Sequence, residues 1–201
     1  MRARLFRRLA NRGATEVIPA SVALESSGAD ELVEAQAVVP AAVLVPLVER
    51  PEGMTVLLTR RADHLNDHPG QISFPGGRIE ARDDDDIDAA LRETEEEIGL
   101  ERAHVEVIGC LDTCLTGTGF RVVPVVGLVS PPFTLALDSS EVAEAFEVPL
   151  SFVLDARNHQ RRSAVRPGGD RREFYVLPWP DNHIWGATAR ILVNLHDLLA
   201  D

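Results

Sequence analysis

The order of segments in the first half of the chain is the feature that most constrains its fold. Two apolar runs rich in valine and leucine, 37–48 and 54–59, are separated by a short polar stretch. The next segment, 60–77, contains Pro69-Gly70 and Pro75-Gly76-Gly77 and is too rich in helix breakers to be helical. The sequence therefore predicts strand, turn, strand and a long loop, and a loop of this length usually has a function.

A helix is predicted directly after this loop, from about Ile87 to Ile98. Acids at 83–88 offer N-caps, strong helix formers follow, and Gly99 stands where a left-handed C-cap is favoured. Sequence patterns also predict strands at 105–111, 121–129 and 174–177 and a last amphipathic helix at about 187–199. Strands and helices interleave, so the expected fold class is α/β with a mixed β-sheet.

Length and composition indicate one globular domain. A chain of 201 residues fits a single core with a short extension. Residues 1–35 are expected to be an N-terminal extension outside the core, and residues 36–201 the domain. Hydrophobic residues make up 45% of the chain and charged residues 26%, which is typical of a packed core. We find neither a signal peptide nor the roughly 20 apolar residues of a membrane span, so a cytoplasmic protein is expected.

The chain is acidic, with a formal net charge of -12 and a pI of about 4.9. This charge disfavours nucleic acid and anionic membranes as partners. All 20 basic residues are arginine, the side chain that can bind a phosphate through two nitrogens. Arginine-only usage fits an anionic substrate, and it fits a bias in genome composition equally well.

The two cysteines, Cys110 and Cys114, lie four residues apart in an apolar stretch. A disulfide, part of a metal site and two buried thiols each fit this spacing. We expect buried thiols, because no nearby Cys/His pair is present to complete a zinc site.

Three glutamates of the predicted helix share one face. Positions three and four apart on a helix lie together, so Glu93, Glu96 and Glu97 converge while Glu95 points elsewhere. They lie near the C-terminal end of the helix, where the partial negative charge of the backbone disfavours acids. A divalent cation such as Mg²⁺ or Mn²⁺, which prefers carboxylate oxygens, would resolve this repulsion. The alternative is a solvated acidic helix face.

The residues around these glutamates match a known motif. Residues 92–100 read Arg-Glu-Thr-Glu-Glu-Glu-Ile-Gly-Leu and resemble the second half of the Nudix box, R-E-U-x-E-E-x-G-U, except that a threonine replaces one aliphatic residue. The resemblance implies a Nudix-type α/β/α sandwich with a mixed sheet. It also implies metal binding by Glu93 and Glu97, with Arg92 orienting Glu93 through a salt bridge and Glu96 as a further ligand or water-binding group.

One departure from the box concerns its first half. The general box places its first glycine fourteen positions before the arginine, but Gly77 lies one position earlier, so the loop holds one extra residue. The isolated acid of the box is then Asp83 when counted from Gly77 and Asp84 when counted back from Arg92. The sequence leaves both open.

The loop before the box resembles the signature of coenzyme A pyrophosphatases. The match covers residues 57–77, Leu-Leu-Thr-Arg-Arg-Ala-Asp-His-Leu-Asn-Asp-His-Pro-Gly-Gln-Ile-Ser-Phe-Pro-Gly-Gly, and later segments at 119–127, 144–150 and 185–189. The resemblance implies metal-dependent cleavage of coenzyme A or acyl-CoA into 4′-phosphopantetheine, or its acyl form, and adenosine 3′,5′-bisphosphate. A homodimer is implied by the resemblance alone.

Several groups in this loop are candidates for binding the substrate phosphates. They are the side chains of Arg60, Arg61, His64 and His68 and the backbone amides of Gly76 and Gly77. Each side chain also fits a loop residue with local partners. A second cluster of basic residues consists of Arg157, Arg161, Arg162, Arg166, Arg171 and Arg172. These arginines either belong to an exposed loop or bind the 3′-phosphate of the substrate.

The resemblance to Nudix enzymes implies that the general base, or an extra metal ligand, is an acid on a later loop, just before a segment that ends in a Pro-Leu pair. Glu141 is the first candidate, followed by Glu144 and Asp138, and Glu96 is the alternative within the helix. Two other functions remain open. One is a Nudix hydrolase for another nucleoside diphosphate derivative, such as NADH, ADP-ribose, a nucleotide sugar or a damaged nucleotide. The other is a Nudix-fold binding module that has lost catalysis.

Overall fold

The computed structural model describes residues 1–10, 17–19, 38–165 and 171–200. Its centre is a mixed sheet in which β2 lies parallel to β8 and antiparallel to β3. The strand order is β1-β7-β8-β2-β3-β4, with β5 paired to β2, β6 to β8 and β9 to β3. The strands of this sheet are β1 (Val17–Pro19), β2 (Val39–Arg50), β3 (Gly53–Arg61), β4 (Ile72–Ser73), β5 (Gly76–Arg78), β6 (Val105–Cys110), β7 (Thr113–Leu115), β8 (Phe120–Val129) and β9 (Val142–Pro149).

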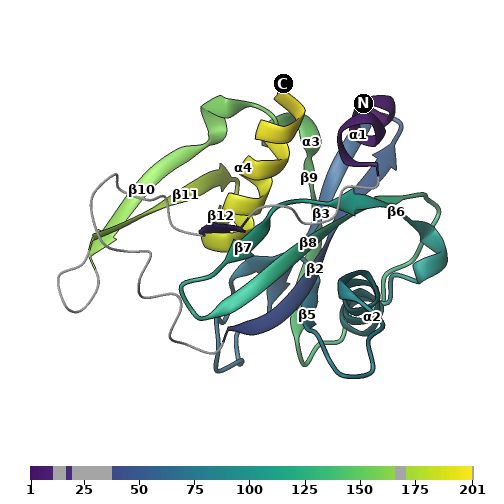
Figure 1. Ribbon diagram of the computed structural model, residues 1–201, viewed down its shortest axis with the longest axis horizontal. Helices are drawn as coiled ribbons and strands as arrows, with labels where there is room; N and C mark the ends of the chain where they lie inside the picture. Colours follow the sequence, from purple (N-terminus) through teal and green to yellow (C-terminus); the bar gives the residue numbers. More distant parts are fainter. Residues whose placement is uncertain (11–16, 20–37, 166–170, 201) are drawn as a thin grey trace.

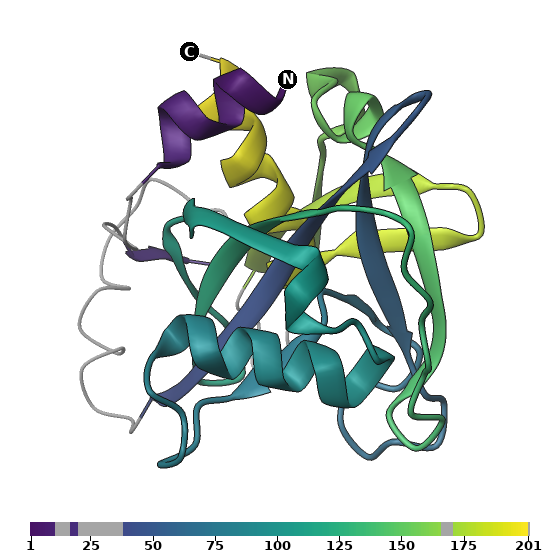
Figure 2. The same ribbon diagram turned by 90° about the vertical axis from the view of Figure 1, so that its right-hand side faces the viewer.

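Helices cover both faces of the sheet. In Figure 1, α2 (Asp86–Ile98) lies below the sheet, and α1 (Arg2–Leu9), α3 (Leu150–Val153) and α4 (Gly186–Ala200) lie above it. Figure 2 shows the same layers from the side, with both termini at the top. Each layer has its own buried apolar cluster, one between α2 and the sheet and one between the sheet and the other helices. The expected α/β/α sandwich with a mixed sheet is confirmed.

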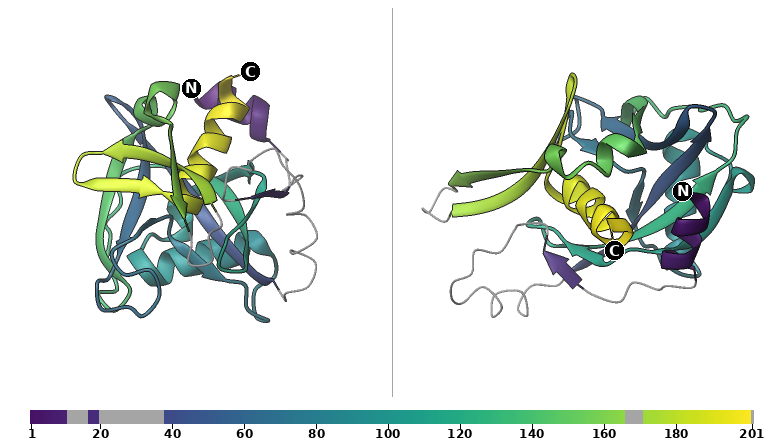
Figure 3. Two further views of the ribbon diagram at one scale, coloured as in Figure 1. Left: turned by 90° about the vertical axis from the view of Figure 1, so that its left-hand side faces the viewer. Right: turned by 90° about the horizontal axis from the view of Figure 1, so that it is seen from above.

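A second, antiparallel sheet packs against α4. It consists of β10 (Gln160–Val165), β11 (Arg171–Trp179) and β12 (Asn182–Trp185), and β11 is the central strand. Figure 3 shows β10 and β11 extending away from the rest of the molecule. The remaining elements of the described residues are two short 3-10 helices, η2 (Arg102–His104) and η3 (Ala156–Asn158).

The predicted elements are present with shifted ends, and several others were missed. The helix predicted at Ile87 to Ile98 is α2, and the strands predicted at 105–111 and 121–129 are β6 and β8. Strands β1, β4, β5, β7, β9, β10 and β12 were not predicted, and β4 and the first residues of β5 lie in the segment 60–77 that was expected to be a loop. The two cysteine thiols are buried and free, as expected, and burial raises the pKa of each.

The N-terminal helix α1 corrects one expectation. Leu5 and Leu9 are fully buried in the core cluster shared with α4, because the amphipathic helix turns its leucines toward the sheet and its arginines outward. Residues 2–9 therefore belong to the core rather than to an extension outside it. Residues 11–16 and 20–37 lie outside the described residues, and the domain boundary at residue 36 stays a prediction.

The described helices were also searched for a membrane span. None of them is long and apolar enough to cross a bilayer.

Candidate active site

Helix α2 begins and ends at residues that satisfy its free backbone groups. The Asp85 side chain accepts a hydrogen bond from the Asp88 N–H at 2.8 Å, which caps the N-terminus. Gly99 adopts the left-handed conformation with φ 68°, and its N–H donates to the Glu95 carbonyl. These caps fix the register of the helix, and therefore the direction in which its glutamates point.

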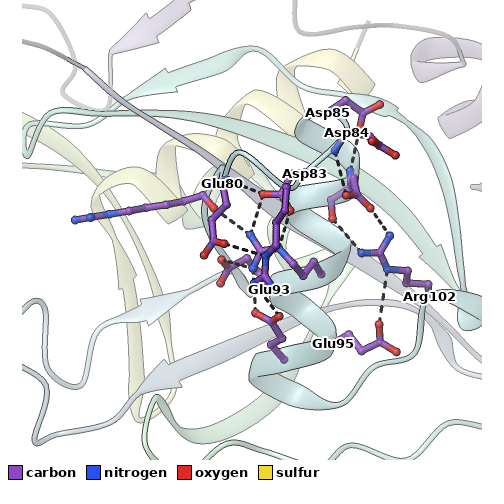
Figure 4. A network of polar contacts seen from close by, with 12 residues as sticks. Glu80, Asp83, Asp84, Asp85, Glu93, Glu95 and Arg102 are labelled. Carbon is purple, nitrogen blue, oxygen red and sulfur yellow. Dashed lines mark hydrogen bonds and ion pairs between the residues drawn. The ribbon is translucent and has the colours of Figure 1, made fainter.

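Arg92 is the centre of a network of carboxylates, of which Asp83 and Glu93 are labelled in Figure 4. Its guanidinium is buried and donates two hydrogen bonds to Asp83, from Nε to Oδ1 at 2.7 Å and from Nη2 to Oδ2 at 2.9 Å. Its Nη1 donates to Glu93 at 2.8 Å and to Glu96 at 2.9 Å. Arg92 therefore links Glu93 to Asp83 in the loop before the helix, and the orienting role that the resemblance implies for Arg92 stays a prediction.

The same network distinguishes Asp83 from Asp84, the two candidates that the sequence left open for the isolated acid of the box. Asp83 is bound by both arms of Arg92, and its side chain is only 1% exposed. Asp84 is exposed and offers its backbone N–H to Asp88. Asp83 thus occupies the place of the isolated acid of the box. The hydrogen bonds from Arg92 and from the Glu80 N–H lower the pKa of Asp83 from 3.8 to about 2.

This geometry predicts that Asp83→Asn lowers the melting temperature by on the order of 5 °C, because it leaves the buried Arg92 without its anion. Asp84→Asn is the matched control and should have almost no effect. The folded pKa lies below the ordinary value, so the stabilisation is present above pH 3.8 and is lost as the pH falls toward 2. In thermal melts the gap between the wild type and Asp83→Asn should narrow over that range. Equal melting temperatures for both variants near pH 7 would contradict the assignment.

Two glycines of β5 lie against the carboxylates of α2. A Cβ at Gly77 would lie 2.5 Å from Oε2 of Glu93, so only glycine leaves room for that carboxylate. Gly76 has a φ of 143°, and its N–H donates to Oε2 of Glu97 at 3.1 Å. The Gly76 amide is thus occupied by a glutamate, and the structure supports a role in positioning Glu97 rather than in binding a phosphate.

Glu97 is a buried carboxylate without a cationic hydrogen-bond partner among the described residues. It is 6% exposed. Burial raises its pKa to about 8, and the nearby charges of Glu141 and Glu93 act in the same direction. Burial also raises the pKa of Glu93, although Arg92 opposes this. The protein therefore disfavours the negative charge on both Glu93 and Glu97.

A hard divalent cation fits this set of oxygen donors. Glu93 and Glu97 could hold it directly, with Glu96 and Glu141 nearby. Among the described residues, no three His, Cys, Asp or Glu side chains are gathered closely enough to form a complete metal cage. This is compatible with ions such as Mg²⁺, which usually keep several waters and share a few protein carboxylates with substrate phosphates.

The upstream loop brings one of its two arginines to the carboxylates. The charge of Arg61 lowers the pKa of Glu97, and its Nε is buried without a partner among the described residues. Arg60 instead pairs with Asp63 at 3.1 Å and Glu144 at 3.5 Å.

The two histidines of this loop lie elsewhere. His64 and His68 are exposed, and no described contact brings either ring to the glutamates. His68 has a left-handed backbone with φ 55° and belongs to the turn that leads to Gly70.

Glu141 is the base candidate whose charge acts on the glutamates of α2. It raises the pKa of both Glu93 and Glu97. Its loop is fixed to the structure on two sides: the Glu141 carbonyl accepts from the Ala62 N–H at 2.8 Å, and the Asp138 N–H donates to the Glu97 carbonyl at 2.9 Å. The Asp138 side chain caps Ser140, and Glu144 pairs with Arg60.

Comparison with known proteins identifies the family. The model of the NUDIX domain family matches residues 38–166. A protein of Enterobacter sp. (strain 638) called "Uncharacterized Nudix hydrolase NudL" is 43% identical over 156 residues, which cover 77% of this chain and 80% of that protein. A protein of the same name from Yersinia enterocolitica is 43% identical over 155 residues and covers 77% and 78%. The chain belongs to the Nudix family.

Solved structures resemble this Nudix chain more distantly. A C. elegans Ap4A hydrolase is 22% identical with a TM-score of 0.48, and the match covers 55% of this chain and 80% of that one. A MutT protein from Methanosarcina mazei Go1 is 21% identical with a TM-score of 0.46, covering 58% and 80%.

Family membership confirms the enzyme class predicted from the motif. The protein is a Nudix hydrolase, a pyrophosphohydrolase, and hydrolases of this family generally need a divalent metal ion. The roles of individual residues in this Nudix site stay predictions.

Proposed function

We propose that this Nudix hydrolase cleaves the diphosphate of coenzyme A or its thioesters, using Mg²⁺ or Mn²⁺. The observation that carries the proposal is the position of Arg61. This residue belongs to the segment that resembles the coenzyme A pyrophosphatase signature, and its charge acts on Glu97 in the box. Of the glycines at the end of that segment, Gly76 donates a hydrogen bond to Glu97, and Gly77 leaves room for the Glu93 carboxylate. The signature and the catalytic helix thus form one site.

The residues of the site supply the groups that hydrolysis of a diphosphate needs. The reaction adds water to one phosphorus, breaks its bond to the bridging oxygen, and yields 4′-phosphopantetheine and adenosine 3′,5′-bisphosphate. When bound, a divalent ion neutralises phosphate charge and lowers the pKa of a coordinated water. Glu93 and Glu97 would hold it, with Glu93 fixed by Arg92. Arg61 would bind a phosphate oxygen, and Glu141 would accept the proton of the attacking water.

A panel assay tests the substrate class. The purified protein is incubated with Mg²⁺ or Mn²⁺ and either CoA, acetyl-CoA, NADH, ADP-ribose or dGTP, and the products are separated by chromatography. We expect metal-dependent release of adenosine 3′,5′-bisphosphate from CoA, faster than cleavage of any other compound. Faster cleavage of another compound would refute the coenzyme A assignment while retaining the catalytic helix. No cleavage at all would favour the binding-module alternative.

The two adjacent arginines give a second test of the site. Arg61→Gln is expected to lower kcat/KM by about tenfold or more, because a charged hydrogen bond to phosphate is lost. Arg60→Gln should have a clearly smaller effect, because Arg60 already has two carboxylate partners. Steady-state kinetics of both variants checks this order. A larger loss for Arg60→Gln would reverse the roles proposed for the pair.

A further inference from the structure

Four arginines of the second basic cluster lie in the β10–β12 sheet and are divided between its two faces, whereas Arg157 lies in η3 and Arg166 lies outside the described residues. Side chains of directly paired residues share a face. Arg161 is paired with Tyr175, and α4 covers that face, with the Arg190 guanidinium 5.8 Å from the centre of the Tyr175 ring. Arg162 is paired with Phe174 on the opposite face. The cluster predicted from sequence therefore does not act as one surface.

The opposite face combines two arginines with two aromatic rings. Trp185 is paired with Val176 and lies edge-on to Phe174, with ring centroids 6.0 Å apart. Arg172 precedes Phe174 by two positions in β11 and so shares its face. We call this surface the Trp185 face, formed by Arg162, Arg172, Phe174 and Trp185.

The side chains of the Trp185 face have few partners among the described residues. Trp185 is 44% exposed, which is unusual for a tryptophan. Arg172 makes no hydrogen bond or ion pair to any described residue, and Arg162 donates only to Gln160 at 2.8 Å. In a chain with a net charge of -12, two arginines without a described carboxylate partner form a local anion-binding surface.

A short chain of contacts connects this face to the catalytic loop. Trp185 is followed by Gly186, where an added Cβ would lie 3.7 Å from Nε2 of Gln71. Thr188 donates to the Ile72 carbonyl at 3.0 Å. The Gln71 carbonyl in turn accepts from the Arg61 N–H at 3.0 Å. Gln71 thus lies next to Gly186, the residue that follows Trp185, and is hydrogen-bonded to Arg61, the arginine that we assign to the diphosphate.

We propose that the Trp185 face binds the phosphorylated adenosine end of the substrate, with the base stacked on Trp185 and the ribose phosphate between Arg162 and Arg172. This inference rests on the proposed function for the identity of the ligand. An aromatic ring recognises a base through stacking, and arginine recognises a phosphate monoester through paired N–H donors. A purely apolar acyl or pantetheine arm would leave both arginines unused.

Direct binding tests the face without any hydrolysis. Trp179→Phe leaves Trp185 as the single tryptophan of the whole chain, which has two. Titration of this variant with adenosine 3′,5′-bisphosphate in the absence of metal should quench its fluorescence. Arg162→Gln and Arg172→Gln should each weaken binding by about tenfold. Arg171→Gln is the matched control, because Arg171 lies in the same strand but on the other face and donates to Ser163. No quenching, or equal weakening by Arg171→Gln, would overturn the proposal.

Hydrolysis separates this proposal from the proposed function. Trp185→Ala should raise KM for CoA by about tenfold, as expected for a lost stacking contact, with a smaller effect on kcat. The wild type is expected to prefer CoA to dephospho-CoA, and this preference should disappear in Arg172→Gln. If the wild type does not cleave CoA but binds the bisphosphate, the proposed function fails and the site stands. If CoA is cleaved and these variants behave as the wild type, the proposal for the Trp185 face is refuted and the proposed function remains.

One further outcome would assign the face to protein contacts. Sedimentation of the wild type and of Trp185→Ala reports the oligomeric state. A dimer that dissociates on this substitution, with bisphosphate binding unchanged, would show that the Trp185 face joins two copies of the chain and would overturn the proposal.

Discussion

Glu97→Gln is expected to lower kcat by on the order of a thousandfold, because it removes a charged metal ligand at the reacting centre. The amide is nearly isosteric, and its oxygen can still accept the Gly76 hydrogen bond. The fold should therefore persist. Steady-state hydrolysis of the best substrate in saturating Mg²⁺ measures the loss, and activity within tenfold of the wild type would remove Glu97 from the metal site.

The same substitution should stabilise the protein in the absence of metal. The folded pKa of Glu97, about 8, lies above its ordinary 4.5, so the carboxylate opposes folding increasingly as the pH rises through that range. Glu97→Gln should match the wild type below pH 4.5. At pH 8 it should melt roughly 2–4 °C higher, the shift that about 1 kcal/mol gives in a chain of this size. Loss of activity together with lower stability would instead indicate a structural role.

Gly77→Ala is expected to lower kcat/KM by about a hundredfold while leaving the melting temperature almost unchanged. The three atoms nearest to the added methyl group would all belong to the end of the Glu93 side chain, at 2.5–2.9 Å. That side chain can move aside by about 1 Å, and a displacement of this size in a catalytic group is enough for such a loss. Activity assays and thermal melts on one preparation test both halves of the prediction.

Gly76→Ala provides the contrasting control. Its Cβ would lie 2.4 Å from the Ala42 carbonyl and 2.5 Å from Cα of Val43, which are backbone atoms of the central strand and cannot move aside. Its φ of 143° adds backbone strain for any residue with a side chain. This variant should lose stability as well as activity. A Gly77→Ala protein that melts as early as Gly76→Ala would contradict the idea that Gly77 serves Glu93.

The sequence predicted those elements whose signals are local. The N-terminal acids and Gly99 delimit α2 to within one residue, because caps depend only on neighbouring residues. Strand β10 was missed, because residues 161–165 are all exposed and show no apolar alternation. Helix α1 was assigned to an extension, because its two buried leucines become informative only once α4 is placed beside them.

The site shows the same limit. Helical spacing predicts that Glu93 and Glu97 converge, and the motif predicts that Arg92 contacts Glu93. The choice between Asp83 and Asp84 depends on the path of a loop with one extra residue, which spacing cannot give. Separation of Arg60 from Arg61 depends on a register shift in the pairing of β3 with β9 at this point. Such tertiary details leave no periodic signal in a single sequence.

The central claim is that the carboxylates of α2, held by β5, bind the catalytic cation. Titration of the metal-free protein with Mn²⁺, followed by electron paramagnetic resonance of the free ion, measures this directly. The account predicts saturable binding to the wild type and to Asp84→Asn, and loss of that binding in the Glu93→Gln/Glu97→Gln double variant. Equal binding of Mn²⁺ by the double variant would place the cation elsewhere and contradict the account.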